Sequence, residues 1–437
     1  MMGKVCVFLT NCYENDARVK RECSALKEAG YKVRLIYVQN YKNRLKEYEI
    51  IDEIEIVRID QFSKILELIY KLWRWIRGVA LNIKNNRLML IVLLPLSIIV
   101  LPMYIVVKIL NIRKFFRFIK KLSIIFRMII EGMKDDYDIY HCNDLDTLLQ
   151  GFICSKVLRN RVLVYDSHEV QTSRTGYKGK KKYAILEKVI INKVDKMMMT
   201  TETRAEFTEK IYGIRPEVIH NYPLYMEKQK EKNNLRKIAN IDKDEPILLY
   251  QGGIQIGRGL EKIIEAIPKF NKGIIVFIGD GAIKEELEKM VLDYGVSDRV
   301  RFIPKVDVEE LMYYTQHAYL GFQVLQNVCF NHYSTLSNKL FEYMMMEVPV
   351  VASDFPEISR VVREEKTGLC INPHDSNNIA DAVNLLLENR RLYEEMKGNC
   401  KSAKLKYNWN WEKHKFISIY DNLMRKFENK ENGLRRA

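Results

Sequence analysis

The sequence has little cysteine and places it in no metal-binding pattern. Eight cysteines are spread over 437 residues, with no CxxC pair and no zinc-like spacing to histidine. A disulfide scaffold and a structural zinc site are therefore not expected, and the thiols of a cytosolic protein are expected to be reduced. The sequence also has no low-complexity tract, and its composition is that of a globular protein.

A secretory leader is not apparent either. The opening residues MMGKVCVFLT form one short apolar stretch, which runs straight into polar NCYENDAR without a cleavage site. The glycine stands third, which does not favour myristoylation. These features predict a protein of the cytoplasm.

Positive charge is abundant, but it is concentrated in one segment. The net charge is +15, and residues 62–134 hold fourteen basic and two acidic residues, a net +12. Elsewhere the charge is therefore about balanced. Within the segment the basic residues are interleaved with an apolar run instead of covering a polar face. We therefore expect no nucleic-acid partner.

The apolar run covers Leu88–Val107, twenty residues without a charge. At about 1.5 Å per residue it would just cross a bilayer core of about 30 Å. Basic residues flank both ends, however, which places both ends on the cytoplasmic side. The chain before and after it also reads as pieces of one sheet. A single crossing is therefore not expected.

The segment 62–134 is instead predicted to attach the protein to the membrane from the cytoplasmic face, as a peripheral or monotopic protein. Pro95 and Pro102 would bend the run, while Trp73 and Trp75 suit the headgroup zone. An anionic membrane surface would attract the excess positive charge. The alternative is a buried helix of a soluble domain, which leaves that charge unexplained.

Outside this segment, short apolar strands alternate with amphipathic helices, a pattern typical of parallel sheets covered on both faces. We predict an N-terminal Rossmann-like domain over 1–225, a polar linker over 226–244 and a second Rossmann-like domain over 245–405. A final helical segment covers 406–437. The predicted strands are 4–10, 33–38, 138–142, 162–166 and 196–200, then 247–251, 273–279, 300–303, 318–322, 350–353 and 368–371. Such domains bind ligands at the carboxyl ends of their strands.

A glycine-rich turn follows the first strand of the second domain. Gly252 and Gly253 end the strand, and Arg258 and Gly259 open the next helix. Glycines let a phosphate approach the backbone, and arginine offers a forked cation to a diphosphate. The pattern is neither a dinucleotide fingerprint nor a P-loop. It predicts an anion site, with a glycine-rich turn and a surface arginine as the alternative.

A second polar group lies at the start of helix 338–346. Asn338, Lys339 and Glu342 fall within one helical turn. The carboxylate could accept hydrogen bonds from ribose hydroxyls, and Lys339 could hold phosphate. The alternative is a capped amphipathic helix that buries Leu340 and Tyr343.

Two strands of the first domain end in polar residues. His141 and Asp144 end one of them, and His168 and Glu169 follow another. These side chains are candidate contacts at the active edge of the sheet. A histidine at such a place can equally be structural.

Together these motifs resemble the retaining glycosyltransferases of family 4, which have the GT-B fold. The resemblance covers the chain apart from about 62–134. It rests on the strand–GG…RG–helix unit, a GDG turn, KLFE followed by VPVVAS, and N-terminal DARV, HCND and DSHE pieces. It also rests on the tail YNWNWE, which precedes a last helix expected to pack back on the N-terminal domain.

The resemblance implies a GT-B fold, two doubly wound domains facing a cleft, here with a hydrophobic basic membrane-association insertion. It implies that Arg258 and Lys339 hold the donor diphosphate, that Glu342 binds the ribose, and that Gly279 and Asp280 lie near the donor. His168 or Asp144 would lie near the transferred sugar, and His168, Asp144 and Glu169 are the catalytic candidates. Asp16 and Arg18 would lie on the acceptor side. It also implies retention of anomeric configuration. No metal and no cofactor are expected beyond the co-substrate, a UDP- or GDP-sugar.

Two positions depart from the family pattern. Ser334 stands where members often carry a first glutamate, and Asn143 stands where they often carry a second histidine. The first departure affects recognition of sugar hydroxyls. The second weakens the case for a histidine base at that strand.

The predicted function is transfer of a sugar to a lipid-linked acceptor in the synthesis of a surface polysaccharide or glycolipid. One alternative is a sugar-nucleotide epimerase of the same fold, which needs no membrane segment. The other is a non-catalytic membrane scaffold, which the serine at position 334 makes conceivable.

Overall fold

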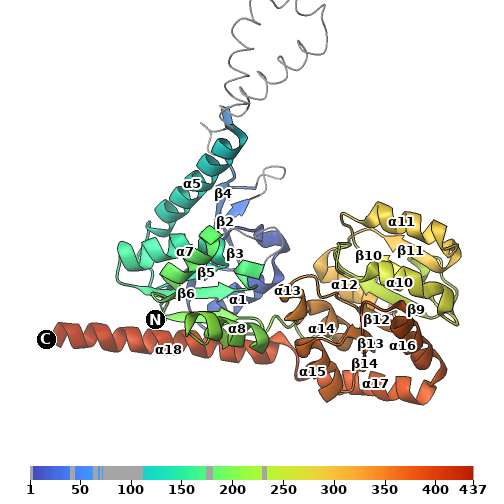
Figure 1. Cartoon of the computed structure of the whole chain (residues 1–437). Coiled ribbons are helices and arrows are strands. Elements are labelled where there is room, and N and C mark those ends of the chain that lie inside the picture. The colour runs from blue at the N-terminus through green and yellow to red at the C-terminus, as the bar shows by residue number, and fades with distance from the viewer. Residues whose placement is uncertain are drawn as a thin grey trace, which may run out of the picture. The chain divides into compact units, whose positions relative to one another are not determined.

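The computed structural model describes residues 3–39, 45–62, 67–68, 71, 112–173, 181–228 and 234–436 (Figure 1). Trp73, Trp75, Pro95, Pro102 and the apolar run 88–107 lie outside these residues. Among the residues described, no helix combines the length and the apolar character needed to cross a bilayer.

The N-terminal part is built on an eight-stranded sheet with the order β3-β4-β2-β1-β5-β6-β7-β8. The strand pairs β1–β2, β1–β5, β2–β4, β6–β7 and β7–β8 are parallel, whereas β3 and β4 form an antiparallel hairpin. Strand order reverses between β1 and β5, which makes their carboxyl ends the expected ligand edge. The strands are β1 Lys4–Leu9, β2 Lys32–Gln39, β3 Tyr48–Ile51, β4 Ile54–Asp60, β5 Ile139–Asn143, β6 Val162–Ser167, β7 Lys196–Met199 and β8 Glu217–Val218.

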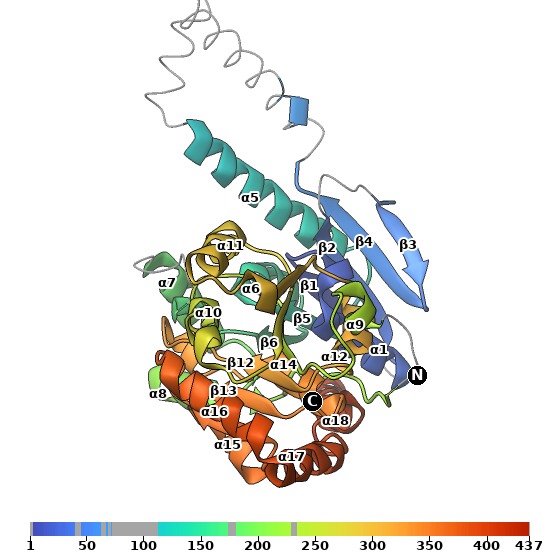
Figure 2. The same ribbon diagram turned by 90° about the vertical axis from the view of Figure 1, so that its right-hand side faces the viewer.

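Helices connect these strands. Strands β1 and β5 are buried along almost their whole length, as strands covered on both faces must be. Helix α5 contacts β2, β4 and α6, and Figure 2 shows it running beside β2 and β4. The helices are α1 Ala17–Glu28, α5 Ile112–Gly132, α6 Leu145–Phe152, α7 Lys181–Ile191 and α8 Glu202–Tyr212.

The C-terminal part is built on a six-stranded sheet with the order β11-β10-β9-β12-β13-β14. Every adjacent pair in it is parallel. This is the doubly wound order, which reverses between β9 and β12. The strands are β9 Ile247–Gln251, β10 Ile274–Ile278, β11 Val300–Ile303, β12 Leu320–Gln323, β13 Val350–Ser353 and β14 Gly368–Ile371.

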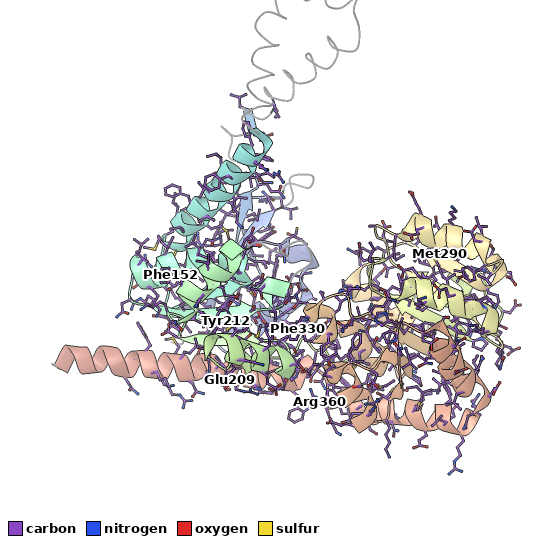
Figure 3. All side chains as sticks on the ribbon, viewed as in Figure 1. Phe152, Glu209, Tyr212, Met290, Phe330 and Arg360 are labelled. Carbon is purple, nitrogen blue, oxygen red and sulfur yellow. The ribbon has the colours of Figure 1, made fainter. Side chains whose placement is uncertain are left out.

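Two hydrophobic clusters cover the two faces of this second sheet. Leu248 and Tyr250 of β9 point into one cluster, and Ile247 and Leu249 point into the other, as the period of two in a strand requires. Met290 of α11, labelled in Figure 3, packs against the first cluster. The helices are α9 Leu235–Ile238, α10 Leu260–Ala266, α11 Lys284–Asp293, α12 Val308–Thr315, α13 Phe330–Tyr333, α14 Asn338–Met345, α15 Pro356–Glu364, α16 Ser376–Glu388, α17 Arg390–Ala403 and α18 Trp409–Arg436.

Several elements differ from the sequence-based expectation. The β3–β4 hairpin, β8 and α17 were not predicted, and α18 begins at Trp409, inside the YNWNWE motif. The segment predicted as a linker holds the short helix α9, capped by the side chain of Asn234. Leu235 of α9 is fully buried, because its side chain joins the second hydrophobic cluster.

Candidate functional site

Two glycine turns pack against each other at the carboxyl ends of β9 and β10. The Gly252 amide donates to the Ile278 carbonyl, and the Ile254 amide donates to the Asp280 carbonyl. At Gly279 φ is 152°, and an added Cβ would lie 2.0 Å from the Gly252 carbonyl oxygen. Only glycine fits so close an approach. The sequence therefore leaves this edge of the sheet bare of side chains, as a phosphate site requires.

Lys339 of α14 lies beside this edge in a buried position. Its Nζ donates to the Tyr250 hydroxyl at 3.2 Å and sits 4.3 Å from the centre of the Tyr250 ring. Gly252 adjoins it, since a Cβ there would lie 3.4 Å from Nζ. Burial, and then the positive charge of Arg258, lower the pKa of Lys339 to about 7, although Glu342 opposes this.

Arg258 adds a second cation to the same place. Within the described part of the chain, neither Arg258 nor Lys339 forms an ion pair with a carboxylate. Arg258 also contributes to lowering the pKa of His332, after burial. Two cations close together are unfavourable until an anion joins them, although Glu342 partly offsets the charge of Lys339. This part of the molecule is therefore arranged as an anion site.

Glu342 is held in place by a chain of polar side chains. Thr315 Oγ1 donates to Gln251 Oε1 at 2.7 Å, and Gln251 Nε2 donates to Glu342 Oε2 at 2.6 Å. Burial raises the pKa of the Glu342 carboxyl, while the Gln251 hydrogen bond opposes the rise. A carboxylate fixed in this way can accept hydrogen bonds from a ligand hydroxyl.

The remaining donor-side candidates surround these groups. Asn338 opens α14 and is half-buried, Gly253 is exposed, and Asp280 is exposed with its carboxylate accepting from the Gly281 amide. Ser334 ends α13, where its buried hydroxyl donates to the Phe330 carbonyl at 2.7 Å. The structure therefore brings Gly252, Arg258, Gly279, Lys339 and Glu342 to one edge of the second sheet.

Asp144 follows β5 at the reversal point of the first sheet and has a strained backbone. Its φ is 61° and its ψ is 166°, a region that residues other than glycine rarely occupy. The side chain is buried and makes no capping hydrogen bond to α6. Strain of this kind gathers at functional sites, so it supports Asp144 as a site residue.

The strain at Asp144 predicts an unusual order of stability between two variants. Asp144→Gly is expected to be more stable than Asp144→Ala by about 1–2 kcal/mol, because only glycine adopts this backbone without cost. In helices the usual order is the reverse, because alanine stabilises a helix more than glycine does. Urea unfolding of both variants measures the difference. An alanine variant as stable as the glycine variant would show that the backbone there is not strained.

A second group of charges is buried around Asp166 of β6. Arg18 of α1 donates to it through Nε at 2.9 Å and through Nη2 at 3.0 Å, and also donates to the Ile219 carbonyl. His168 Nε2 lies 3.2 Å from Asp166 Oδ2. The Asp166 carboxylate therefore fixes the rotation of the His168 imidazole. Predicted as an acceptor-side residue, Arg18 is only 4 % exposed and contacts this cluster.

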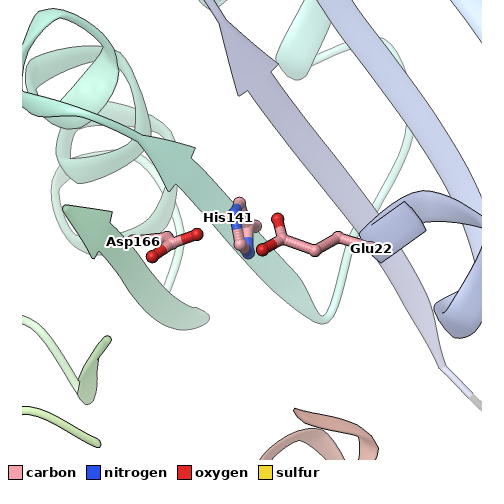
Figure 4. A group of neighbouring side chains, drawn as sticks. All are labelled: Glu22, His141 and Asp166. Carbon is pink, nitrogen blue, oxygen red and sulfur yellow. The ribbon is translucent and has the colours of Figure 1, made fainter. Parts of the chain in front are cut away.

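Glu22 completes the cluster, 2.9 Å from Arg18 Nε. Burial, reinforced by the nearby Asp166, raises the pKa of Glu22 to about 8, although Arg18 opposes this. Figure 4 shows Glu22, Asp166 and His141 together. Each offers one atom that could bind a metal, and these three atoms lie within 4.8 Å of one another. These three residues could in principle hold a metal ion. The Arg18 guanidinium already lies against both carboxylates, however, and would repel a metal cation.

The other N-terminal candidates lie at strand or helix ends. His141 and Asn143 are buried in β5, where His141 Nε2 is 3.3 Å from Asn143 Oδ1. Glu169 is half-buried, and its carbonyl accepts from Ser167 Oγ. Asp16 is half-buried just before α1.

Sequence reasoning did not identify Tyr250, Gln251, Glu22 or Asp166 as site residues. Tyr250 and Gln251 contact residues about ninety positions away, which no local pattern reveals. Glu22 did leave a signal, because it falls on the apolar face of α1 between Val19 and Leu26. A charged residue on such a face needs a buried partner.

Solved structures share this fold over nearly the whole chain. Sucrose-phosphate synthase from Thermosynechococcus elongatus aligns with a TM-score of 0.73 and 17% identity, covering 97% of this chain and 100% of that one. HepE from Anabaena in complex with UDP-glucose aligns with a TM-score of 0.65 and 11% identity, covering 98% and 100%. At such low identity the likeness shows the fold alone. The expected GT-B fold is thereby confirmed.

Family resemblance is concentrated in the C-terminal part. Residues 231–403 match the model of the family described as Glycosyl transferases group 1. An alpha-D-kanosaminyltransferase from Streptomyces kanamyceticus is 30% identical over 178 residues, 38% of this chain. The matched region is 42% of that relative's length. Residues 231–403 therefore resemble the group 1 glycosyltransferases.

Proposed function

We propose that this protein is a retaining glycosyltransferase. It moves a sugar from a UDP- or GDP-sugar to a lipid-linked acceptor at the cytoplasmic face of the cell membrane. The observation that carries the proposal is the pair of cations Arg258 and Lys339 beside the glycine turns of β9 and β10. In the described residues, neither cation has a carboxylate in ion-pair contact.

A nucleotide-sugar fits this pair by charge and by shape. Its diphosphate carries two negative charges, which match two cations, and the bare glycine edge leaves room for phosphate oxygens. Glu342, oriented by Gln251, stands three residues along α14 from Lys339 and would accept from the ribose hydroxyls. HepE, which shares the fold, was solved with UDP-glucose bound.

The chemistry that follows is electrostatic. The bond between the anomeric carbon and the diphosphate oxygen breaks, and negative charge grows on the leaving diphosphate. Arg258 and Lys339 would stabilise that charge as it forms. The acceptor hydroxyl forms the new glycosidic bond, and its proton passes to the departing diphosphate. Retention of configuration is proposed from the resemblance to family 4, and the experiment below tests it.

The lipid-linked acceptor is proposed from the N-terminal part. Residues 62–134 carry a net +12 and enclose the uncharged run 88–107. Such a segment favours the anionic cytoplasmic leaflet, where lipid-linked acceptors are presented. The product would then be a surface polysaccharide or a glycolipid.

The test is a turnover assay of purified protein against UDP-, GDP- and ADP-sugars, with and without detergent-solubilised lipid acceptors. We expect one donor to be consumed, faster with lipid, and consumption to fall at least about 100-fold in Glu342→Ala. Glu285→Ala, an exposed carboxylate on α11, is the matched control and should keep full turnover. NMR of the product reports the anomeric configuration.

Each alternative gives its own result in this assay. Conversion of one sugar-nucleotide to another without acceptor would identify an epimerase. Failure to bind any donor would leave a non-catalytic scaffold. A product with inverted anomeric configuration would support the transferase proposal and contradict the retaining mechanism.

A further inference from the structure

Helix α5 carries a row of exposed apolar side chains. Phe118, Leu122, Phe126 and Ile130 are 59%, 45%, 65% and 45% exposed. They are spaced four residues apart, which places them in one row along the helix. We call this row the α5 stripe. Single exposed apolar residues are ordinary on a protein surface, but four aligned along three turns form a patch that marks an interaction site.

The opposite side of α5 is already used for packing. Met128 is fully buried, Lys120 Nζ donates to Gln61 and lies 4.7 Å from the Phe62 ring, and Arg127 donates to the Asp60 carbonyl. The helix is therefore anchored on β4 through its other face. Ile130, at the end of the stripe, also lines a pocket with Asp60, Phe62 and Arg127, whereas Phe118, Leu122 and Phe126 do not line it.

Positive charge lines one edge of the α5 stripe. Lys114, Arg117 and Lys121 are exposed, and their spacings of three and four residues set them in a row next to Phe118 and Leu122. Lys121 also forms an ion pair with Asp146. Across the described side chains of α5 the one acidic residue is Glu131, at the far end. An apolar row edged by cations is the pattern of a helix that lies in a membrane interface.

We propose that the α5 stripe docks on an anionic bilayer. The helix would lie in the plane of the interface, with the four apolar side chains reaching the acyl boundary and Lys114 and Arg117 meeting lipid phosphates. The sequence supports this occupant, because the uncharged run 88–107 is separated from α5 by residues 108–111 alone. A protein partner would match the apolar row but would not need anionic lipid.

This proposal rests on the membrane part of the proposed function, which assigns residues 62–134 to attachment, and it names the α5 stripe inside that segment as a lipid contact. Attachment through residues 62–111 alone would leave the stripe without a role. The two contacts are therefore distinguished by changing α5 while leaving residues 62–111 intact.

The test measures binding of the full chain to vesicles by co-sedimentation over a range of lipid concentrations. Vesicles of phosphatidylcholine are compared with vesicles that also contain phosphatidylglycerol. We expect tighter binding to the anionic vesicles, weakened by salt. Phe118→Ser/Phe126→Ser should bind at least about tenfold more weakly. Lys114→Gln/Arg117→Gln should lose about fivefold per cation at low salt.

The matched control is Leu292→Ser/Leu385→Ser, which removes two exposed leucines from α11 and α16. It should bind as the unchanged protein does, and thermal unfolding should show that every variant is folded. Unaltered binding of both α5 variants, or no binding of the unchanged protein, would overturn the proposal. If the vesicle results hold while no donor is consumed in the turnover assay, the α5 proposal stands and the transferase proposal falls.

Discussion

Replacing Lys339 by methionine is expected to abolish donor turnover while making the ligand-free protein harder to unfold. Methionine keeps the length of the buried side chain and removes its charge. Turnover should fall by at least about 100-fold, as when one group that stabilises a leaving-group charge is removed. The free energy of unfolding at pH 6 should rise by about 1–3 kcal/mol, because burial and the charge of Arg258 disfavour the protonated Lys339 more than Glu342 favours it.

The stability gain depends on pH in a defined direction. Lys339 has a folded-state pKa of about 7 and an ordinary value of 10.5. Between these values the unfolded chain holds a proton that the folded protein has released, so the stability of the unchanged protein rises with pH. The methionine variant lacks this pH-dependent contribution to stability, because it has no titrating group at position 339. Its advantage should therefore be full below pH 7 and shrink towards pH 10, which urea unfolding at several pH values measures.

Whereas the stability of the unchanged protein should rise with pH, its affinity for the donor should fall. The diphosphate of a nucleotide-sugar keeps its charge between pH 6 and pH 9, whereas Lys339 loses its proton above about pH 7 in the ligand-free protein. Affinity should therefore fall as the pH rises, and the methionine variant should show a flat profile. Lys289→Met, on the exposed surface of α11, should change neither property. A methionine variant that keeps turnover would show that Lys339 meets no donor anion. A methionine variant that is less stable at pH 6 would show that the protein itself already compensates the charge of Lys339.

The fold was readable from sequence where local patterns determine it. Parallel strands such as β9 and β10 are continuous apolar runs bounded by glycine, and both were predicted within a residue or two. In the β3–β4 hairpin, β4 does have buried apolar residues (Ile54, Ile56, Val57 and Ile59) and was nevertheless not predicted, whereas β3 lacks them. Tyr48, Ile50 and Ile51 of β3 are exposed, so the strand shows no buried face. Helix α17 escaped because its residues are mostly polar, with Tyr393, Met396 and Cys400 as the buried positions.

The arrangement of the candidate anion site could also be partly predicted from sequence. Glycines and a cation after a strand predict an anion site, and the structure brings Gly252, Gly279, Arg258 and Lys339 to one edge of the second sheet. The side chains that contact Lys339 and Glu342 could not be predicted from the sequence. Tyr250 contacts Lys339, and Gln251 donates a hydrogen bond to Glu342. Both contacts join β9 to α14, so they depend on how these two elements pack and not on the spacing of residues in the sequence. The cluster around Asp166 was missed for the same reason, since α1 and β6 are far apart in the chain.

The second large effect is expected from Asp166→Asn, through His168. Asparagine keeps the shape of the side chain and one acceptor oxygen, but it removes the charge that faces both Arg18 and the His168 imidazole. The imidazole then loses the carboxylate that fixes its rotation, and turnover should fall by about 10–100-fold. Kinetic assays at saturating and at limiting donor measure the loss in kcat and in KM.

Stability should change less than usual for a broken buried ion pair, which costs about 3–5 kcal/mol. The reason is Glu22, whose pKa is raised to about 8 by burial and by the charge of Asp166. Once that charge is gone, Glu22 can ionise and pair with Arg18, 2.9 Å away. We expect a loss of about 1–2 kcal/mol at pH 7, and a larger loss in Glu22→Gln/Asp166→Asn, where neither carboxylate remains.

A double-variant comparison separates positioning of His168 from simple structural damage. If Asp166 acts through His168, then Asp166→Asn/His168→Ala should turn over no more slowly than His168→Ala alone, because the same contribution cannot be lost twice. Glu187→Gln is the matched control: Glu187 is another buried carboxylate, bonded to Tyr165 of β6 and to Tyr212. It should lower stability and leave turnover intact. Additive losses in Asp166→Asn/His168→Ala would instead mean that Asp166 affects turnover by a route other than His168.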